Sequence, residues 1–290
     1  MASCNKSILD LVEFVERDIP QLVELSTSVG WDYDERELKT VLASGNIFGH
    51  KDLEERIVSS AAIIPYGRSL ASIGMVIVHE DYRGMGLGEE ATKRCIEDVT
   101  TDTPIMLIAT KEGSPLYKKM GFNSVGYVDK YICDHYMFDH DPLLGSNTTI
   151  EEYSGVDMDA IYKLDERAFG ATRTRFLKIR MKQAEQIFVA KDDQGAIVGY
   201  GLSISGPVHL ILGPIVARDF QVASGLIDKL AINHQGKIRI DVPLENNEFM
   251  MFLNRRGFVN VNRPPIMVIN SDSLPTRNNT LFSIAAQVFG

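Results

Sequence analysis

The stretch from residue 75 to residue 88 constrains the fold of this chain more than any other. It opens with four apolar, mostly β-branched residues, Met75–Val78, which predict a buried strand. An arginine and three alternating glycines follow: Arg83, Gly84, Gly86 and Gly88. Residues 89–99 then have the apolar spacing of a helix. A strand, a glycine loop and a helix start together present free backbone N–H groups to an anion, so the stretch predicts a phosphate-binding loop.

Three known phosphate-loop patterns can be compared with this loop. The dinucleotide pattern Gly-x-Gly-x-x-Gly does not fit, because the third glycine comes one place early. The nucleoside-triphosphate loop ends in Gly-Lys-Ser/Thr, whereas this chain has Gly88-Glu89-Glu90. The pattern Arg/Gln-x-x-Gly-x-Gly/Ala fits residues 83–88 at every position. The stretch therefore closely resembles the pyrophosphate loop of the GCN5-related N-acetyltransferases (GNAT); the alternative is a glycine-rich turn of another α/β protein.

A second motif lies at residues 113–122, which read as a short helix, a terminating Gly121 and the start of a strand at Phe122. GNAT proteins are similar here, with a tyrosine four residues before Gly-Phe. The resemblance implies that Tyr117 is the catalytic residue, with its phenol near the sulfur of coenzyme A, where it can protonate the leaving thiolate. The alternative is that Tyr117 only packs on the sheet.

The second half of the chain repeats the first. Residues 47–58 align without gaps to residues 187–198, and Gly-Phe recurs at Gly257-Phe258. Continued at an offset of 139, the alignment pairs Arg83 with Val222 and Gly88 with Ile227. A period of this size corresponds to a whole domain. The second copy has therefore lost the residues of the cofactor loop.

The whole chain thus resembles tandem GNAT proteins with an active first copy and a degenerate second copy. The resemblance implies an α/β fold with mixed sheets, in the form of two acyl-CoA N-acyltransferase folds. We expect a catalytic domain at residues 1–140, a linker at 141–150 and the degenerate domain at 151–290. The linker is placed on its polar, Pro- and Gly-containing sequence.

Composition excludes several other classes. The net charge is −9, from 39 acidic and 30 basic residues, and no basic run is present, so nucleic acid is not expected as a partner. No stretch approaches 18 consecutive apolar residues, so no membrane association is expected. Three scattered cysteines lack metal-ligand spacing, and no secretory signal is visible, which favours a cytoplasmic protein without a metal.

The resemblance implies transfer of the acetyl group of acetyl-CoA, the co-substrate, directly to a primary amine of a small molecule or peptide. The alternative is a non-catalytic protein that binds acetyl-CoA or acts as a scaffold. Oligomeric state does not follow from the sequence. The residues expected to bind the cofactor lie on the strand and the loop: Met75, Val76, Ile77, Arg83, Gly84, Met85, Gly86, Leu87 and Gly88.

The acceptor side is less defined by the sequence. Trp31 and Asp32, between two expected helices, are candidates for substrate contacts, and Trp31 can equally be a core residue. His79, Glu80 and Asp32 are the candidates for a general base, each with a surface or capping role as the alternative. Because ligand pockets favour domain interfaces, we expect the second half to cover the acceptor side.

Overall fold

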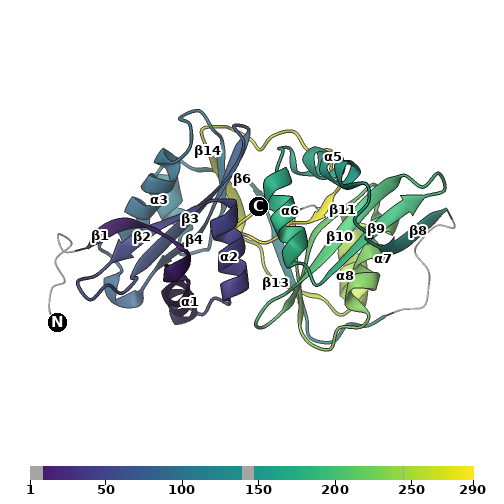
Figure 1. The fold of residues 1–290 in the computed structure, drawn as a ribbon, viewed down its shortest axis with the longest axis horizontal. Helices are drawn as coiled ribbons and strands as arrows, with labels where there is room; N and C mark the ends of the chain where they lie inside the picture. Colours follow the sequence, from purple (N-terminus) through teal and green to yellow (C-terminus); the bar gives the residue numbers. More distant parts are fainter. Residues whose placement is uncertain (1–8, 139–146, 244) are drawn as a thin grey trace.

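The structure is a computed structural model that describes residues 9–138, 147–243 and 245–290. It has two lobes, each built from a mixed β-sheet with flanking helices (Figure 1). The elements that precede residue 139 are β1 (Asp10–Phe14), η2 (Glu16–Asp18), α1 (Ile19–Ser28), α2 (Glu35–Ser44), β2 (Asn46–Lys51), β3 (Ser59–Tyr66), β4 (Leu70–Val78), η3 (Glu80–Tyr82), α3 (Leu87–Glu97), β5 (Ile105–Ile108), α4 (Ser114–Lys119), β6 (Asn123–Tyr127) and β7 (Asp129–Cys133).

The second half of the chain repeats this order of elements. They are β8 (Thr148–Glu152), α5 (Met158–Phe169), α6 (Thr174–Gln183), β9 (Gln186–Asp192), β10 (Ile197–Ser205), β11 (Leu210–Ala217), α7 (Phe220–Ala231), β12 (Ile238–Val242), α8 (Asn247–Arg255), β13 (Val259–Asn262), β14 (Pro265–Ile269) and β15 (Leu281–Ser283). The predicted linker falls partly outside the described residues, and its residues 148–150 begin strand β8.

The two sheets confirm the predicted α/β class. The seven-stranded sheet has the order β1-β2-β3-β4-β5-β14-β6, and the eight-stranded sheet has the order β13-β7-β12-β11-β10-β9-β8. Each contains one parallel pair, β4 with β5 and β11 with β12, whereas its other pairs are antiparallel. Local signals explain the helix starts: Pro20 lies in the first turn of α1, and the Asp34 carboxylate caps α2 by accepting from the Glu37 N–H at 2.7 Å.

The two halves exchange strands. Strand β7, from the first half, lies between β12 and β13 of the eight-stranded sheet. Strand β14, from the second half, lies between β5 and β6 of the seven-stranded sheet, where Figure 1 shows it within the other lobe. The two folds are therefore not separated by a cut at the linker. Each sheet is completed by a strand from the other half.

The last ten residues bridge the lobes. Strand β15 joins the second sheet through β11, and the chain then runs to the first sheet. There the Ser72 hydroxyl donates a hydrogen bond to the Val288 carbonyl at 2.9 Å. A Cβ atom at Gly74 would lie 2.7 Å from the Cα of Val288. Glycine is therefore needed where the C-terminal segment crosses β4.

Helices α2 and α6 pack together across the two lobes, in the middle of Figure 1. The guanidinium of Arg180 is fully buried between them and donates to the carboxylate of Glu37 and to the carbonyl of Ala285. Gln183 donates a further hydrogen bond to Glu37 at 2.7 Å. Because a buried charge is costly unless it is paired, these contacts fix the relative position of the lobes.

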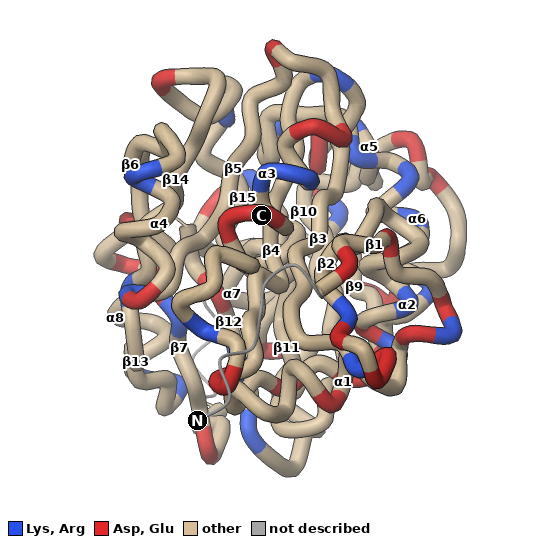
Figure 2. The backbone as a smooth tube through the Cα atoms, turned by 90° about the vertical axis from the view of Figure 1, so that its left-hand side faces the viewer, with Lys and Arg blue, Asp and Glu red and all other residues tan. Residues whose placement is uncertain are grey.

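Two surface properties bear on possible partners. Within the described ranges, no helix has the length and apolar character needed to cross a membrane. On the side drawn in Figure 2, acidic and basic residues are interspersed along the backbone, and neither sign gathers in one region. The exclusion of nucleic acid stays a prediction.

Candidate active site

Strands β4 and β5 lie side by side only over a short distance. Their parallel pairing covers Ala71–Ile73 and ends there, so β4 continues from Gly74 without this neighbour. The backbone of β4 is irregular at Met75, where φ is 51° and the register with β3 shifts. The Ser60 hydroxyl donates to the Met75 carbonyl at 2.8 Å and holds this bend. The free edge of β4 can accept hydrogen bonds from an extended ligand, as in strand addition.

The glycine loop leads directly into an uncapped helix. Gly84 and Gly86 have φ values of 81° and 80°, in the left-handed region that favours glycine. No side chain caps the first turn of α3, which begins at Leu87. The first N–H groups of a helix have no acceptor within it, so those of α3 are available to an anion. Arg83 is exposed and has no ion-pair partner in the described part of the chain.

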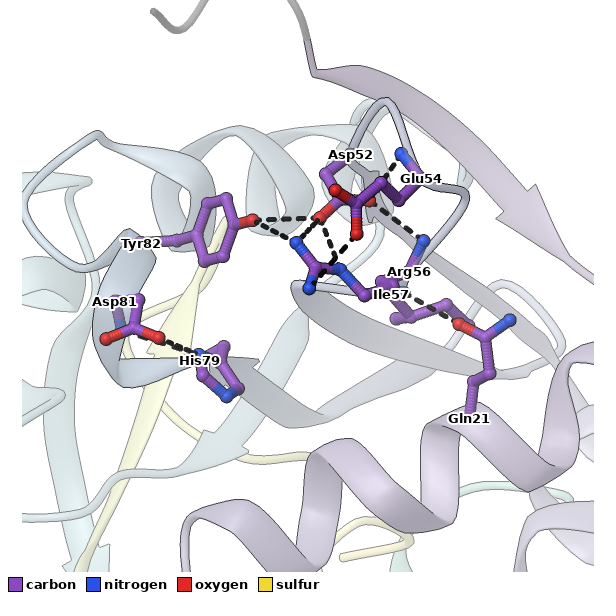
Figure 3. A network of polar contacts seen from close by, with 8 residues as sticks. All are labelled: Gln21, Asp52, Glu54, Arg56, Ile57, His79, Asp81 and Tyr82. Atoms are coloured by element: carbon purple, nitrogen blue, oxygen red, sulfur yellow. Dashed lines mark hydrogen bonds and ion pairs between the residues drawn. The ribbon is translucent and has the colours of Figure 1, made fainter. Parts of the chain in front are cut away.

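A buried carboxylate anchors the turn that precedes this loop (Figure 3). Asp52 accepts hydrogen bonds from the Tyr82 hydroxyl at 2.9 Å, from Arg56 Nε at 2.8 Å and from the Arg56 backbone N–H at 3.0 Å. Burial alone would raise the pKa of Asp52, but these donors outweigh it and lower the pKa to about 2. Tyr82 directly precedes Arg83, so this network fixes the position at which the glycine loop begins.

A groove of about 480 Å³ runs along the free edge of β4 toward α3 and α4. The predicted cofactor residues that line it are Met75, Val76, Ile77, Arg83 and Gly88. Gly84, Met85 and Gly86 lie on the loop between Arg83 and the helix. The side chain of Leu87 is buried in the core, so this residue offers only its backbone to a ligand. The groove, the free strand edge and the uncapped helix together fit a long ligand with a pyrophosphate.

Tyr117, on helix α4, also lines this groove. Its ring packs against Phe122 with 5.8 Å between the centroids. Its hydroxyl has no hydrogen-bond partner among the residues that the structure describes. Burial raises the pKa of Tyr117, so its phenol stays protonated at neutral pH and can donate a proton. Packing and a chemical role are both compatible with this position.

A second, smaller cavity of about 180 Å³ adjoins the groove and lies between the lobes. Trp31 and Asp32, the predicted acceptor residues, both line it. The other lining residues come from both halves of the chain: Gly30, Tyr33, Glu37, Gly74, Met75, Ile108, Thr110, Lys130, Ile211, Arg239, Ala286, Gln287 and Val288. Asp32 contacts His209 of the second half, with 3.3 Å between Oδ2 and Nδ1.

The groove and the cavity meet at one place. Trp31, Gly74, Met75, Ile108 and Thr110 line both of them. This junction lies where β4 and β5 separate, between the glycine loop and the second lobe. A ligand in the groove and a ligand in the cavity would therefore meet at the bend of β4.

Only one of the three predicted general-base candidates reaches this junction region. Asp32 lines the cavity, whereas His79 borders a separate hollow between α1 and η3. Glu80 is exposed at the start of η3 and lines neither the groove nor the cavity. His79 and Glu80 therefore lie away from the junction, which fits the surface or capping roles that were their alternatives.

Comparison with known proteins gives the family. Residues 32–134 and residues 161–283 each match the acetyltransferase (GNAT) domain. An uncharacterized N-acetyltransferase of Bacillus subtilis, YitH, is 35% identical over 282 residues, which are 97% of this chain and 98% of that protein. The chain belongs to the GNAT family. It consists of two GNAT domains in tandem, which confirms the resemblance seen in the sequence.

Solved structures show the same GNAT architecture. A putative acetyltransferase from Pyrococcus horikoshii matches with a TM-score of 0.81 and 20% identity, over 100% of this chain and 99% of that one. A tandem GNAT protein from the clavulanic acid biosynthesis pathway matches with a TM-score of 0.65 and 18% identity, over 91% of this chain and 99% of that one. At these identities the likeness concerns the fold alone.

The second GNAT domain lacks the glycine loop altogether. Residues 79–86 connect β4 to α3, but only Arg218 and Asp219 connect β11 to α7. The Asp219 carboxylate accepts a hydrogen bond from the Val222 N–H at 2.9 Å and so caps α7 itself. Residues 222–227, which the ungapped alignment paired with the loop, lie inside this helix. That alignment is wrong beyond the end of β11, because the loop is deleted rather than substituted.

In the second domain, the strand edge that corresponds to the free edge of β4 is occupied. Strand β11 pairs with β12 only at Leu210 and Ile211, and β15 then pairs with β11 at Ile215 and Val216. The Ser283 hydroxyl donates to the carbonyl of Leu212 at 2.7 Å. Strand β15 of the same chain therefore takes the place on β11 that stays open on β4.

Several residues of the cavity were not predicted from the sequence. Lys130 and Arg239 lie on β7 and β12, which become neighbours only through the strand exchange. Gln287 reaches the cavity on the C-terminal segment. No motif marks these residues, because their role depends on where distant segments meet.

Proposed function

We propose that this GNAT protein transfers the acetyl group of acetyl-CoA directly to the primary amine of a small acceptor. The junction of the groove with the cavity carries this proposal, because it lets both substrates meet beside Met75 without a covalent enzyme intermediate. Holding two reactants in contact supplies a large part of the rate in such reactions. The N-terminal domain carries the chemistry, and the C-terminal domain closes the acceptor side.

Each part of the groove has a role in this proposal. When bound, acetyl-CoA supplies the thioester carbonyl that the amine attacks. The N–H groups at the start of α3 and the side chain of Arg83 hold the pyrophosphate. The backbone edge of β4 beyond Gly74 aligns the pantetheine arm. Tyr117 donates its proton to the sulfur as the carbon–sulfur bond breaks.

The cavity holds the acceptor in the same proposal. Asp32 attracts the ammonium form of the amine, which releases one proton to solvent water before its nitrogen attacks the thioester carbonyl. Trp31 lies beside both ligands and excludes water from the junction. The cavity, at about 180 Å³, is smaller than the roughly 300–1,000 Å³ of ordinary ligand pockets, so it suits a small acceptor.

The test is release of coenzyme A from acetyl-CoA in the presence of a panel of primary amines. The wild-type protein is compared with Gly88→Val. A Cβ atom at Gly88 would lie 3.4 Å from Val78 Cγ2, an ordinary contact, and the side chain that it carries would obstruct the groove. We expect Gly88→Val to lose acetyl-CoA binding and turnover while it keeps the wild-type circular dichroism spectrum. A wild-type protein that binds acetyl-CoA but releases no coenzyme A with any amine would contradict catalysis and indicate a binding protein.

A further inference from the structure

The charged side chains of the acceptor cavity allow an inference about the acceptor itself. Four of them line the cavity: Asp32, Glu37, Lys130 and Arg239. Glu37 is committed to the α2–α6 contact, where it accepts from Arg180 and Gln183. Its charge is therefore already balanced within the protein.

The nearest carboxylate on this side of the cavity, that of Asp241, is paired with Arg239 and not with Lys130. Asp241 lies opposite Lys130 in the β7–β12 ladder. Arg239 forms an ion pair with Asp241, with 2.8 Å between Nη2 and Oδ2. Gln287 donates to its other oxygen at 3.3 Å. Lys130 forms no ion pair or hydrogen bond within the described ranges, and it is half-buried. This side of the cavity therefore has one positive charge without a partner.

The surroundings of Lys130 agree with this excess of positive charge. Burial, followed by the positive charge of Arg239, lowers the pKa of Lys130, and the charges of Asp241 and Asp32 only partly oppose the effect. An anion beside the Lys130 ammonium would stabilise its charged form against both its burial and the repulsion by Arg239. Asp32 is the remaining acid of the cavity, and its contact is the imidazole of His209. The cavity thus offers one available carboxylate and one available ammonium.

We propose that the acceptor is a small amino acid-like molecule, whose carboxylate binds Lys130 and whose amine faces Asp32. This inference rests on the acetyl transfer proposed above and names its substrate class. One unpaired cation matches the single charge of a carboxylate, whereas a phosphate dianion would require two. A polyamine would place a second positive charge against Lys130 and Arg239. A lysine side chain within a protein offers no free carboxylate, and the cavity is too small to take a folded surface.

The experiment compares standard amino acids with their α-carboxamides as acceptors for the wild-type protein. The carboxamide keeps the shape and the amine but removes the charge. We expect kcat/KM to be about 10- to 100-fold higher for the acid than for the carboxamide of the preferred acceptor, as for hydrogen bonds to a charged group. Lys130→Met should lower kcat/KM for the acid by about that factor, so that the acid and the carboxamide are used about equally.

Two further variants serve as controls. Lys130→Arg keeps the positive charge and should retain the preference for the acid. Lys229→Met removes an exposed lysine of α7 and should change nothing. Equal use of acids and carboxamides by the wild-type protein, or an acid preference that survives in Lys130→Met, would overturn the proposal.

Binding separates this proposal from that of acetyl transfer. N-acetyl amino acids, the expected products, should raise the thermal unfolding midpoint of wild type and Lys130→Arg in the presence of coenzyme A. They should not raise that of Lys130→Met. This readout needs no turnover, so a protein without transferase activity can still show the carboxylate site. If no N-acetyl amino acid stabilises the wild-type protein, the carboxylate site is refuted even when other amines are acetylated.

Discussion

Among single residues, Tyr117 is the one on which the chemistry depends most directly. Tyr117 lines the groove, its hydroxyl has no partner in the described structure, and its ring packs on Phe122. Tyr117→Phe keeps the ring, so we expect unchanged affinity for acetyl-CoA and a kcat lower by about 10²-fold, the lower end for general acid catalysis. Tyr127→Phe, at a half-exposed position on β6, is the matched control. Turnover of Tyr117→Phe at the wild-type rate would show that Tyr117 is a packing residue.

Asp52 gives a prediction about stability and pH. Its pKa is lowered to about 2 in the folded protein, below the ordinary value of 3.8. A carboxyl with a depressed pKa stabilises the fold above its unfolded pKa, and this contribution is lost as the pH falls from about 4 toward 2. We expect Asp52→Asn to lower the free energy of unfolding by about 2 kcal/mol at pH 7 and by progressively less below pH 4. Urea unfolding at several pH values measures this.

The control for Asp52 is Asp193→Asn, at an exposed turn between β9 and β10. Its unfolding free energy should match that of wild type throughout. A deficit in Asp52→Asn that stays constant between pH 7 and pH 3 would contradict the assignment of the stabilisation to the charged carboxylate. Because Asp52 holds Tyr82 next to the glycine loop, the variant should also bind acetyl-CoA more weakly.

Residues with local signals could be predicted from the sequence, and residues placed by distant contacts could not. Gly84 and Gly86 of the loop are needed for their own backbone angles, and Tyr117 has a fixed spacing to Gly121. Both conditions can be read from neighbouring residues. Lys130 is an ordinary strand lysine in the sequence, and it becomes a cavity residue only because β7 joins the other sheet. His79 and Glu80 precede the loop directly but line neither the groove nor the cavity, because sequence adjacency to the loop does not place a side chain at the bend of β4.

At the scale of elements, two helix starts and two strand edges distinguish the domains. Helix α3 is uncapped and follows a glycine loop, whereas Asp219 caps α7 after a connection of two residues. The edge of β4 is free, whereas β15 covers that of β11. We therefore expect isothermal titration calorimetry to give one acetyl-CoA site per chain. Asp219→Ala should leave this stoichiometry unchanged, because the loop and the edge are still missing; two sites in either protein would contradict the argument.

Local signals explain individual elements but not their partners. Pro20 in the first turn of α1, the Asp34 cap of α2 and the apolar run of β4 each act within a few residues. Strands β7 and β14 are short alternating or apolar runs that would satisfy either sheet. The choice between the sheets is made by tertiary packing, which local propensity does not encode. The domain boundary expected at the linker was placed on local composition, which carries no information about the strand exchange.

At the scale of the whole molecule, the strand exchange makes the two domains interdependent. A fragment of residues 1–140 would lack β14, so β5 and β6 would lose the strand between them. It would also carry β7 with unpaired edges, because β12 and β13 belong to the other half. Exposed strand edges promote association. We therefore expect this fragment to aggregate or stay unfolded when it is produced alone.

The two halves should nevertheless assemble when they are produced together. Residues 1–140 and residues 147–290, expressed as separate chains in one cell, can complete both sheets and the α2–α6 contact without the intervening residues. We expect a 1:1 complex by size-exclusion chromatography with light scattering, and one acetyl-CoA site per complex. A 1–140 fragment that is monomeric, folded and binds acetyl-CoA with wild-type affinity would contradict the exchange, since its sheet would then close without β14. In that case the first lobe would be an independent domain, and Lys130 on β7 would be free of the acceptor cavity.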